Sequence, residues 1–499
     1  MTTSPRREVL GRTAAGALWA LAARQSERLI GIANIAVLAR VLTPADFGIV
    51  GMAGAAVSLV EILNAFGFDW ALVRMAHPSK AHYDSAWTMR LLLGFTMAAV
   101  IAALSYPLTV FYGVPSIAVV LLAMAGNSLI SSCENIGTVD FRRDMRFDRE
   151  FRFRLTSKVL SFAASLAAAI TLRSYWALII GITVGRLVTV VSSYWMSAYR
   201  PCFDLSMRKD LLSFSGWLLL GNVMDTLRAK FADIFIGRTF GPRSVGFYAM
   251  ALELSTLATS ELAAPINRVA FSNYSQNAGN LPALTSNFQR VSGLIWIIGL
   301  PMAGGMYACA DQIVLLLLGA QWGVSAAILK VLAISGAVAV MEANTHYVFW
   351  ALGRARLVAA LSAAGFIVFV PIAILAALSH GVVGVAYAHL IASVATFALN
   401  YAALTRTLRT RLSSMPVRNW RVLTATIAMV VVVHHFGVGL SDVSILSLTG
   451  RLVFMVLLGV SAYIFLLASL WILFGRSDGP ERDSLTLVSQ MYRSLRGHQ

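Results

Sequence analysis

Two arginines in the first apolar stretch have the spacing of a phosphate-binding pair. Arg24 and Arg28 lie four residues apart, so on a helix they share one face. Two guanidinium groups on one face offer forked donors that suit phosphate oxygens. Glu27 follows Arg24 by one turn and can hold it in place, and Asp225 with Arg228 repeats this arrangement later in the chain. We therefore expect these five residues to bind a phosphate-bearing cargo.

Other charged side chains also fall inside apolar stretches. A charge at membrane depth costs several kcal/mol unless it faces protein or a water-filled cavity. The glutamates, for which we expect ion pairs between helices, are Glu61, Glu134, Glu253, Glu261 and Glu342. The basic residues Arg90, Arg186 and Lys230 can also reach a membrane interface, and Asp233 is a further charge in an apolar stretch.

The helix that carries Arg24 and Arg28 has a second copy in the sequence. Four identities and one acidic pair are each 198 residues apart: Trp19 and Trp217, Arg40 and Arg238, Pro44 and Pro242, Gly48 and Gly246, and Glu27 and Asp225. Shared helix-end punctuation is the alternative explanation. We interpret the register as an internal duplication.

The composition is that of an integral membrane protein. The chain of 499 residues is 58% hydrophobic and 13% charged, with a mean hydropathy of +0.73, whereas soluble domains carry about 25% charged residues. The net charge of +17 does not indicate nucleic-acid binding, because the basic residues cluster in short segments between apolar runs. Cys133, Cys202 and Cys309 lie far apart and predict neither a disulfide framework nor a metal site.

The apolar runs predict an all-α, polytopic protein with about 14 transmembrane helices. The predicted spans are 15–39, 47–67, 86–110, 115–137, 155–172, 174–197, 214–237, 246–266, 291–310, 325–352, 356–379, 382–404, 420–438 and 446–474. Arginine is concentrated in every second connection, which places both termini in the cytoplasm. We favour an ordinary basic loop for the stretch 140–154, with an interfacial helix as the alternative.

The duplication then predicts the architecture. An offset of 198 residues covers six predicted spans, so both copies enter the membrane from the same side. The sequence therefore predicts two parallel six-helix bundles with a cavity between them. The bundles occupy residues 1–198 and 199–405, two additional helices follow in 406–475, and a cytoplasmic tail covers 476–499.

No catalytic or metal-binding motif accompanies these spans. The chain has no Gly-rich loop ending in Lys-Ser or Lys-Thr, which argues against an ATPase, and no serine nucleophile elbow. His434 and His435 are adjacent and cannot share a helix face as metal ligands. We expect no catalytic residue, no metal and no cofactor, and the protein is not predicted to be an enzyme.

The stretch from Leu38 to Arg74 resembles the N-terminal signature of the polysaccharide flippases, which belong to the multidrug/oligosaccharidyl-lipid/polysaccharide exporter superfamily. The shared features are an arginine, a Leu-Thr-Pro turn, an acidic residue, Phe-Gly, and a later Gly-x-x-x-Ala-x-x-Arg. Leu317, Leu318, Gly319 and Trp322 are similar to a second, weaker family pattern. The resemblance spans most of the chain and is strongest to the exopolysaccharide and O-antigen branch.

This resemblance implies an inner-membrane flippase that works by alternating access. Its implied cargo is an undecaprenyl-diphosphate-linked oligosaccharide, moved from the inner to the outer leaflet. Arg24 and Arg28 match basic cavity residues of the family's first helix. Membrane lipids are implied partners, a polysaccharide polymerase and export machinery are further candidates, and nucleic acid is not.

Two alternatives stay open from the sequence. A cation-coupled antiporter of drugs or small molecules would share the fold but would favour an acidic cavity without paired arginines. A membrane polysaccharide polymerase or ligase would favour a long extracytoplasmic loop, and the predicted loops are short.

Overall fold

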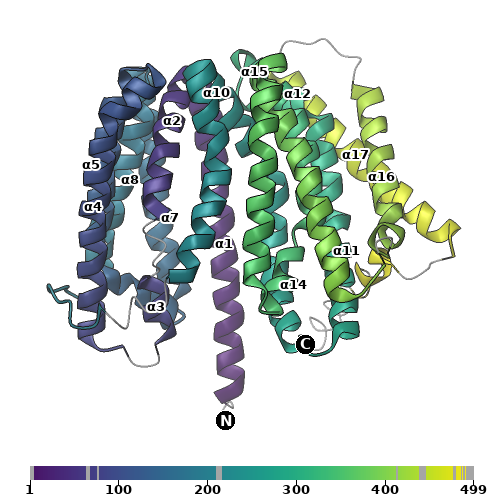
Figure 1. Ribbon diagram of the computed structural model, residues 1–499, viewed down its shortest axis with the longest axis horizontal. Helices are drawn as coiled ribbons and strands as arrows, with labels where there is room; N and C mark the ends of the chain where they lie inside the picture. Colours follow the sequence, from purple (N-terminus) through teal and green to yellow (C-terminus); the bar gives the residue numbers. More distant parts are fainter. Residues whose placement is uncertain are drawn as a thin grey trace. The chain divides into compact units, whose positions relative to one another are not determined.

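The computed structural model describes residues 5–62, 68–75, 78–208, 216–411, 414–437, 445–475 and 479–484, with Thr486 and Ser489. Within these residues the regular elements are helices, and none is a strand (Figure 1). The chain divides into two compact units, Met1–Gly246 and Phe247–Gln499. The predicted all-α polytopic fold is confirmed, whereas the domain boundaries near 198 and 405 stay predictions.

The first unit is built from long apolar helices. Its elements are α1 (Pro5–Val41), α2 (Pro44–Glu61), α3 (Phe68–Arg74), α4 (Lys80–Tyr112), α5 (Ser116–Ser132), η2 (Ile136–Val139), α6 (Asp140–Arg143), α7 (Phe147–Leu172), α8 (Trp176–Met196) and the first arm of α10 (Gly216–Gln276). Helix α7 packs on both α1 and α8, and α5 packs on α4 and α8 (Figure 1). These contacts bury the small residues of each helix and leave large apolar side chains on the outside, as a membrane protein requires.

The turn between α1 and α2 explains part of the family-like signature. Thr43 is the N-cap of α2, and it forms a capping box with Asp46. Pro44 stands at the first helical position, where its missing N–H costs nothing. The Asp46 carboxylate also accepts the Tyr175 backbone N–H at 3.0 Å, so it joins this turn to the start of α8.

The four Pro and Gly positions of the predicted duplication meet in the first unit. A Cβ on Gly48 would overlap the carbonyl oxygen of Pro242, and a Cβ on Gly246 would overlap that of Pro44. Each glycine therefore allows the backbone of the other copy to approach closely. This exchange of equivalent contacts is the pattern that a twofold relation between two copies produces, although the duplication itself stays a prediction.

A polar strap follows α8 and crosses the start of α4. The buried Asp84 carboxylate accepts hydrogen bonds from the Tyr199 hydroxyl and the Cys202 backbone N–H. Burial, and then the hydrogen bond to Asp84, raise the pKa of the Tyr199 phenol. Thr88 accepts the Asp204 backbone N–H in the next turn, so α4 holds this connection over several residues.

The second unit contains the second arm of α10 and the remaining helices. They are α11 (Leu281–Ala308), α12 (Ala310–Leu317), η3 (Ala320–Trp322), α13 (Gly323–Glu342), α14 (Thr345–Ala351), α15 (Ala355–Leu408), α16 (Ser414–Gly437) and α17 (Ile445–Leu473). Helix α11 packs on α13 and α16, and α13 packs on α15. Their shared core includes Trp296, Phe349 and Met429, which are almost completely buried.

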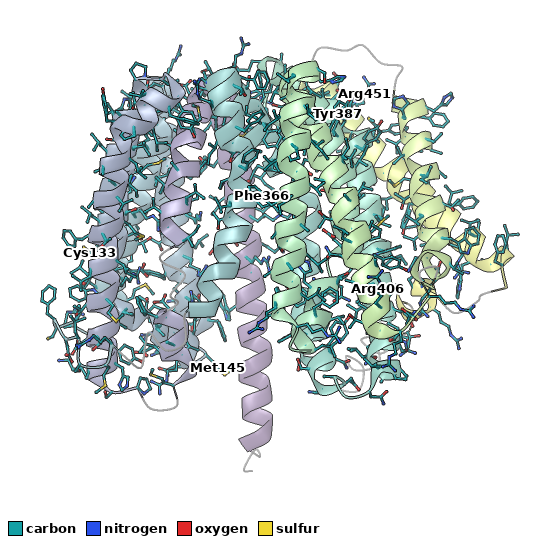
Figure 2. All side chains as sticks on the ribbon, in the orientation of Figure 1. Cys133, Met145, Phe366, Tyr387, Arg406 and Arg451 are labelled. Atoms are coloured by element: carbon teal, nitrogen blue, oxygen red, sulfur yellow. The ribbon has the colours of Figure 1, made fainter. Side chains whose placement is uncertain are left out.

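Helices α10 and α15 are each a pair of arms joined at a glycine. Gly241 has φ +76° and Gly381 has φ +58°, a region that side chains with a Cβ rarely enter. In α15 the arms fold back on one another. Phe366 and Arg406 lie on different arms, and Tyr387 lies near the end that the arms share (Figure 2). The breaks at Gly241 and Gly381 separate the predicted spans 214–237 and 246–266, and 356–379 and 382–404.

The structure refines one predicted span and corrects one expected loop. The predicted span 325–352 largely coincides with Ala320–Ala351, which is long and apolar enough to cross a membrane, and Ala343 and Asn344 separate α13 from α14 within it. The stretch 140–154, expected to be a loop, is helical in α6 and again from Phe147 onward in α7, because Asp148 and Glu150 favour the positive end of the helix dipole. In the described part of the chain nine helices are long and apolar enough to span a membrane, and the count of fourteen stays a prediction.

Candidate functional site

A charged cavity of about 390 Å³ lies within the first unit. Its wall is formed by α1, α3, η2, α6, α7 and α8, and by Glu134 in the connection between α5 and η2. Four carboxylates and four cationic groups line it, so the formal charge of the wall balances: Glu27, Asp69, Glu134, Glu150, Arg142, Arg154, Lys158 and Arg186. A site with closely spaced donors and acceptors suits polar ligands such as sugar hydroxyls more than a bare anion.

Glu150 is the centre of the ion pairs in this cavity. Its Oε1 accepts from Arg142 Nε at 2.8 Å and lies 2.9 Å from Arg154 Nη2. Arg154 Nη1 is also 3.8 Å from Glu27 Oε1, which links α7 to α1. The Arg154 side chain is 42% exposed, so these pairs contribute modestly to stability and more to the orientation of the guanidinium.

A second pair at the cavity wall is more enclosed. Arg90 on α4 contacts Glu134 at 2.6 Å, and both side chains are 19% exposed. The same guanidinium donates to the Ser131 carbonyl, while Arg186 donates to the Ser131 hydroxyl. The expected interhelical ion pair of Glu134 is confirmed, and Arg90 is a pairing residue rather than one that extends to an interface.

The five predicted cargo residues all belong to the first unit, and the structure distributes them over two helices. Arg24, Glu27 and Arg28 lie on α1 and are half-buried, one turn apart. Glu27 lines the cavity, and Arg24 and Arg28 are not among its lining residues. Arg228 is half-buried on α10, and the side chain of Asp225 lies outside the described residues.

The structure gives Glu27 a partner that the sequence did not suggest. Its carboxylate lies next to Arg154 of α7, and the expected contact with Arg24 stays a prediction. Sequence reasoning treated Arg142 and Arg154 only as cytoplasmic positive charge. The four-residue spacing of Glu150 and Arg154 indicates an ion pair on a helix. It was not used, because the stretch 140–154 was expected to be a loop.

Comparison with known proteins decides the family. The family described as polysaccharide biosynthesis protein matches residues 37–327, more than half of the chain. The chain belongs to this family. It is 24% identical to the teichuronic acid biosynthesis protein TuaB of Bacillus subtilis, over 91% of this chain and 94% of that protein. It is 19% identical to the lipopolysaccharide biosynthesis protein WzxC of Escherichia coli, over 78% of this chain and 80% of that protein.

Solved structures share the fold. The lipid II flippase MurJ in an inward closed conformation matches with a TM-score of 0.73 and 13% identity, covering 91% of this chain and 98% of that chain. An inward-facing multidrug resistance transporter of the MATE family matches with a TM-score of 0.59 and 14% identity, covering 77% and 95%. At these identities the likeness shows the fold alone.

These comparisons confirm the resemblance seen in the Leu38–Arg74 stretch. The protein is a multi-pass bacterial membrane protein of polysaccharide biosynthesis, and its family and folds are those of transporters and flippases rather than enzymes. The cargo residues and the orientation in the membrane stay predictions.

Proposed function

We propose that this polysaccharide-family transporter flips undecaprenyl-diphosphate-linked oligosaccharide units from the inner to the outer leaflet of the cytoplasmic membrane, for exopolysaccharide or O-antigen synthesis. Membership of the polysaccharide biosynthesis family carries the proposal. The half-buried arginines at membrane depth on α1 support it, because a charge is retained at that depth mainly for function. Alternating access of two bundles is the mechanism that we propose with it.

Arg24, Arg28 and Arg228 are the residues that we propose to hold the diphosphate. A diphosphate needs several charged donors, and it must also be released on the far side of the membrane. Arg24 and Arg28 offer two forks on one face of α1, and Arg228 is the candidate third donor on α10. Glu27 and Asp225 are proposed to offset part of the positive charge of these arginines. The Glu27 carboxylate also lies beside the guanidinium of Arg154.

Both termini and the segment around α6 are proposed to be cytoplasmic. The support is the clustering of arginine in alternate connections, since basic connections stay inside. A reporter fused after Asp148 and another at the C-terminus should both be active in the form that requires the cytoplasm. An extracytoplasmic signal at either position would contradict the proposed topology. A polymerase and export machinery are proposed partners on the far side.

The test of the cargo site is polysaccharide export in Arg24→Ala and Arg28→Ala variants, measured with the amount of protein in the membrane. Removing one charged hydrogen bond to the diphosphate should weaken binding by about 1.5–3 kcal/mol, so the double variant should export far less. Lysine at either position should rescue in part, because it keeps the charge and removes the fork.

Arg411→Ala is the matched control. It removes the same charge from an exposed position after α15, so export should be unchanged. Normal export from the Arg24→Ala/Arg28→Ala double variant would contradict the proposed site. Loss of export with loss of the protein from the membrane would assign the arginines a structural role instead.

A further inference from the structure

A segment near the C-terminus folds back onto the helices of the second unit. After α17, residues 479–484 form a short helical turn, in which the Asp483 N–H donates to Gly479 O at 3.2 Å. The sequence predicted only a tail from residue 476 onward. The structure attaches residues 479–484, which we call the strap, to α11 and α16.

The most enclosed attachment of the strap is an ion pair. The Glu481 carboxylate accepts from Arg421 Nε of α16 at 2.9 Å and from its Nη2 at 3.0 Å, the forked geometry that a guanidinium and a carboxylate prefer. The side chains of Arg421 and Glu481 are 4% and 6% exposed. Lifting the strap would separate this pair, and breaking a buried ion pair by removing one partner is strongly destabilising.

Two further contacts join the strap to α11. Asp483 Oδ2 lies 2.8 Å from Arg418 Nη2 of α16, and its Oδ1 lies 3.7 Å from Arg290 Nε of α11. Pro480 packs against Gly293 of α11, where an added Cβ would lie 3.0 Å from the proline Cβ. The strap therefore holds α11 and α16 at the same time, through charge and through close packing.

Helix α17 is bonded to α11 beside the strap. The Tyr463 hydroxyl of α17 donates to Ile297 O at 2.8 Å, one turn beyond Gly293. Apolar packing gives membrane helices little driving force to associate, because lipid is as apolar as their side chains. The polar contacts of the strap and of Tyr463 therefore contribute much of what holds α16 and α17 on α11.

We propose that residues 479–484 fasten α16 and α17 to α11, and that this strap stays closed while the protein transports its cargo. The three helices then move as one body, and the two additional helices after α15 are a fixed part of the second unit. Docking of the strap is independent of the proposed function. Only the statement about the transport cycle rests on it.

The test joins the strap to α11 with a short cross-linker in living cells. Gly293→Cys and Pro480→Cys are introduced into a full-length chain whose three native cysteines are replaced by serine. The Cβ positions of this pair are close enough for linkage by dibromobimane, a permeant reagent that becomes fluorescent when it joins two nearby thiols. The double variant should become fluorescent, and its polysaccharide export after treatment should equal that of the two single-cysteine variants treated alike.

Two results of this experiment would overturn the proposal. Absence of fluorescence in the double variant would show that the strap does not dock on α11. Fluorescence with loss of export, in the double variant only, would show that the strap must open during transport. The cross-link is read without any cargo, so an error in the proposed cargo, which the Arg24/Arg28 double variant tests, leaves the docking result unchanged.

Glu481→Lys covers the case in which the cysteine pair fails to fold. It places a lysine beside Arg421 in the enclosed site, so the unfolding temperature of the purified full-length protein in detergent should fall by about 5 °C. Ser489→Lys adds the same side chain at an exposed position nearby and is the matched control, which should unfold as the wild type does. Equal unfolding temperatures for Glu481→Lys and the wild type would also overturn the docked strap.

Discussion

The two units each contain a helix break with a glutamate and an asparagine, and the two breaks are satisfied differently. In the first unit α5 ends at Ser132 and η2 begins at Ile136, with a bend of 68° between α5 and the helical segment that follows. Glu134 and Asn135 lie in this break, and in the second unit Glu342 ends α13 and Asn344 lies between α13 and α14.

In the first unit, the polar groups of Glu134 and Asn135 at the break are bound by other residues of the same unit. Glu134 has a guanidinium 2.6 Å away on Arg90. Asn135 uses both ends of its amide, because Nδ2 donates to Tyr199 O at 2.7 Å and Oδ1 accepts Gly137 N–H at 2.9 Å. Its backbone N–H donates to Ser193. Both ends of the Asn135 amide are therefore hydrogen-bonded within the first unit.

In the break of the second unit the amide nitrogens of Asn267 and Asn400 are bound, and their oxygens have no partner among the described residues. Glu342 accepts a hydrogen bond from the Asn400 amide, and Glu134 accepts one from the Arg90 guanidinium. The difference teaches that the same residue types at a helix break take their partners from different elements: in the first unit from η2 and the connection after α8, in the second from α10 and α15.

The largest expected effect in this comparison comes from Arg90→Ala. Removing the guanidinium leaves the Glu134 carboxylate enclosed without its partner, which should destabilise the protein by about 3 kcal/mol. Thermal unfolding in detergent and abundance in the membrane measure the loss. The Arg90→Ala/Glu134→Gln double variant should recover much of it, because no enclosed charge remains at this pair. Wild-type stability of Arg90→Ala would show that the first break is not held by this pair.

A smaller effect is expected from Asn135→Ala. The change leaves the Gly137 N–H and the Tyr199 carbonyl without their side-chain partner and should cost about 2 kcal/mol. Thermal unfolding in detergent measures the loss. A wild-type unfolding temperature for Asn135→Ala would show that this amide does not hold the first break.

Much of the fold was accessible from the sequence because it depends on local composition. Long apolar runs identify helices such as α4 and α17 directly, and glycines at 241 and 381 fall between predicted spans. The register that pairs Pro44 with Pro242 and Gly48 with Gly246 was also visible. Their reciprocal contact was not, because a repeat in sequence does not state which backbone atoms approach one another.

The candidate site was predicted less completely. The charges at membrane depth could be found by reading hydropathy, and the pair of Arg24 and Arg28 by helical spacing. The contact between Glu27 and Arg154 could not be predicted, because Arg154 lies on another helix, α7. The interruption at Ala343 and Asn344 within the predicted span was not foreseen either, since neither residue is a proline or a glycine.

By itself the sequence determined the class of molecule: a helical membrane protein of the polysaccharide biosynthesis family, with Arg24 and Arg28 inside an apolar stretch. Those properties follow from residue type and periodicity. Only the tertiary structure decided which polar groups satisfy one another. Arg90 meets Glu134 across 44 residues, Asn400 meets Glu342 across 58, and Asn267 meets Ala343 O across 76. Pairing over such distances is set by helix packing, which decides which donor a buried oxygen meets.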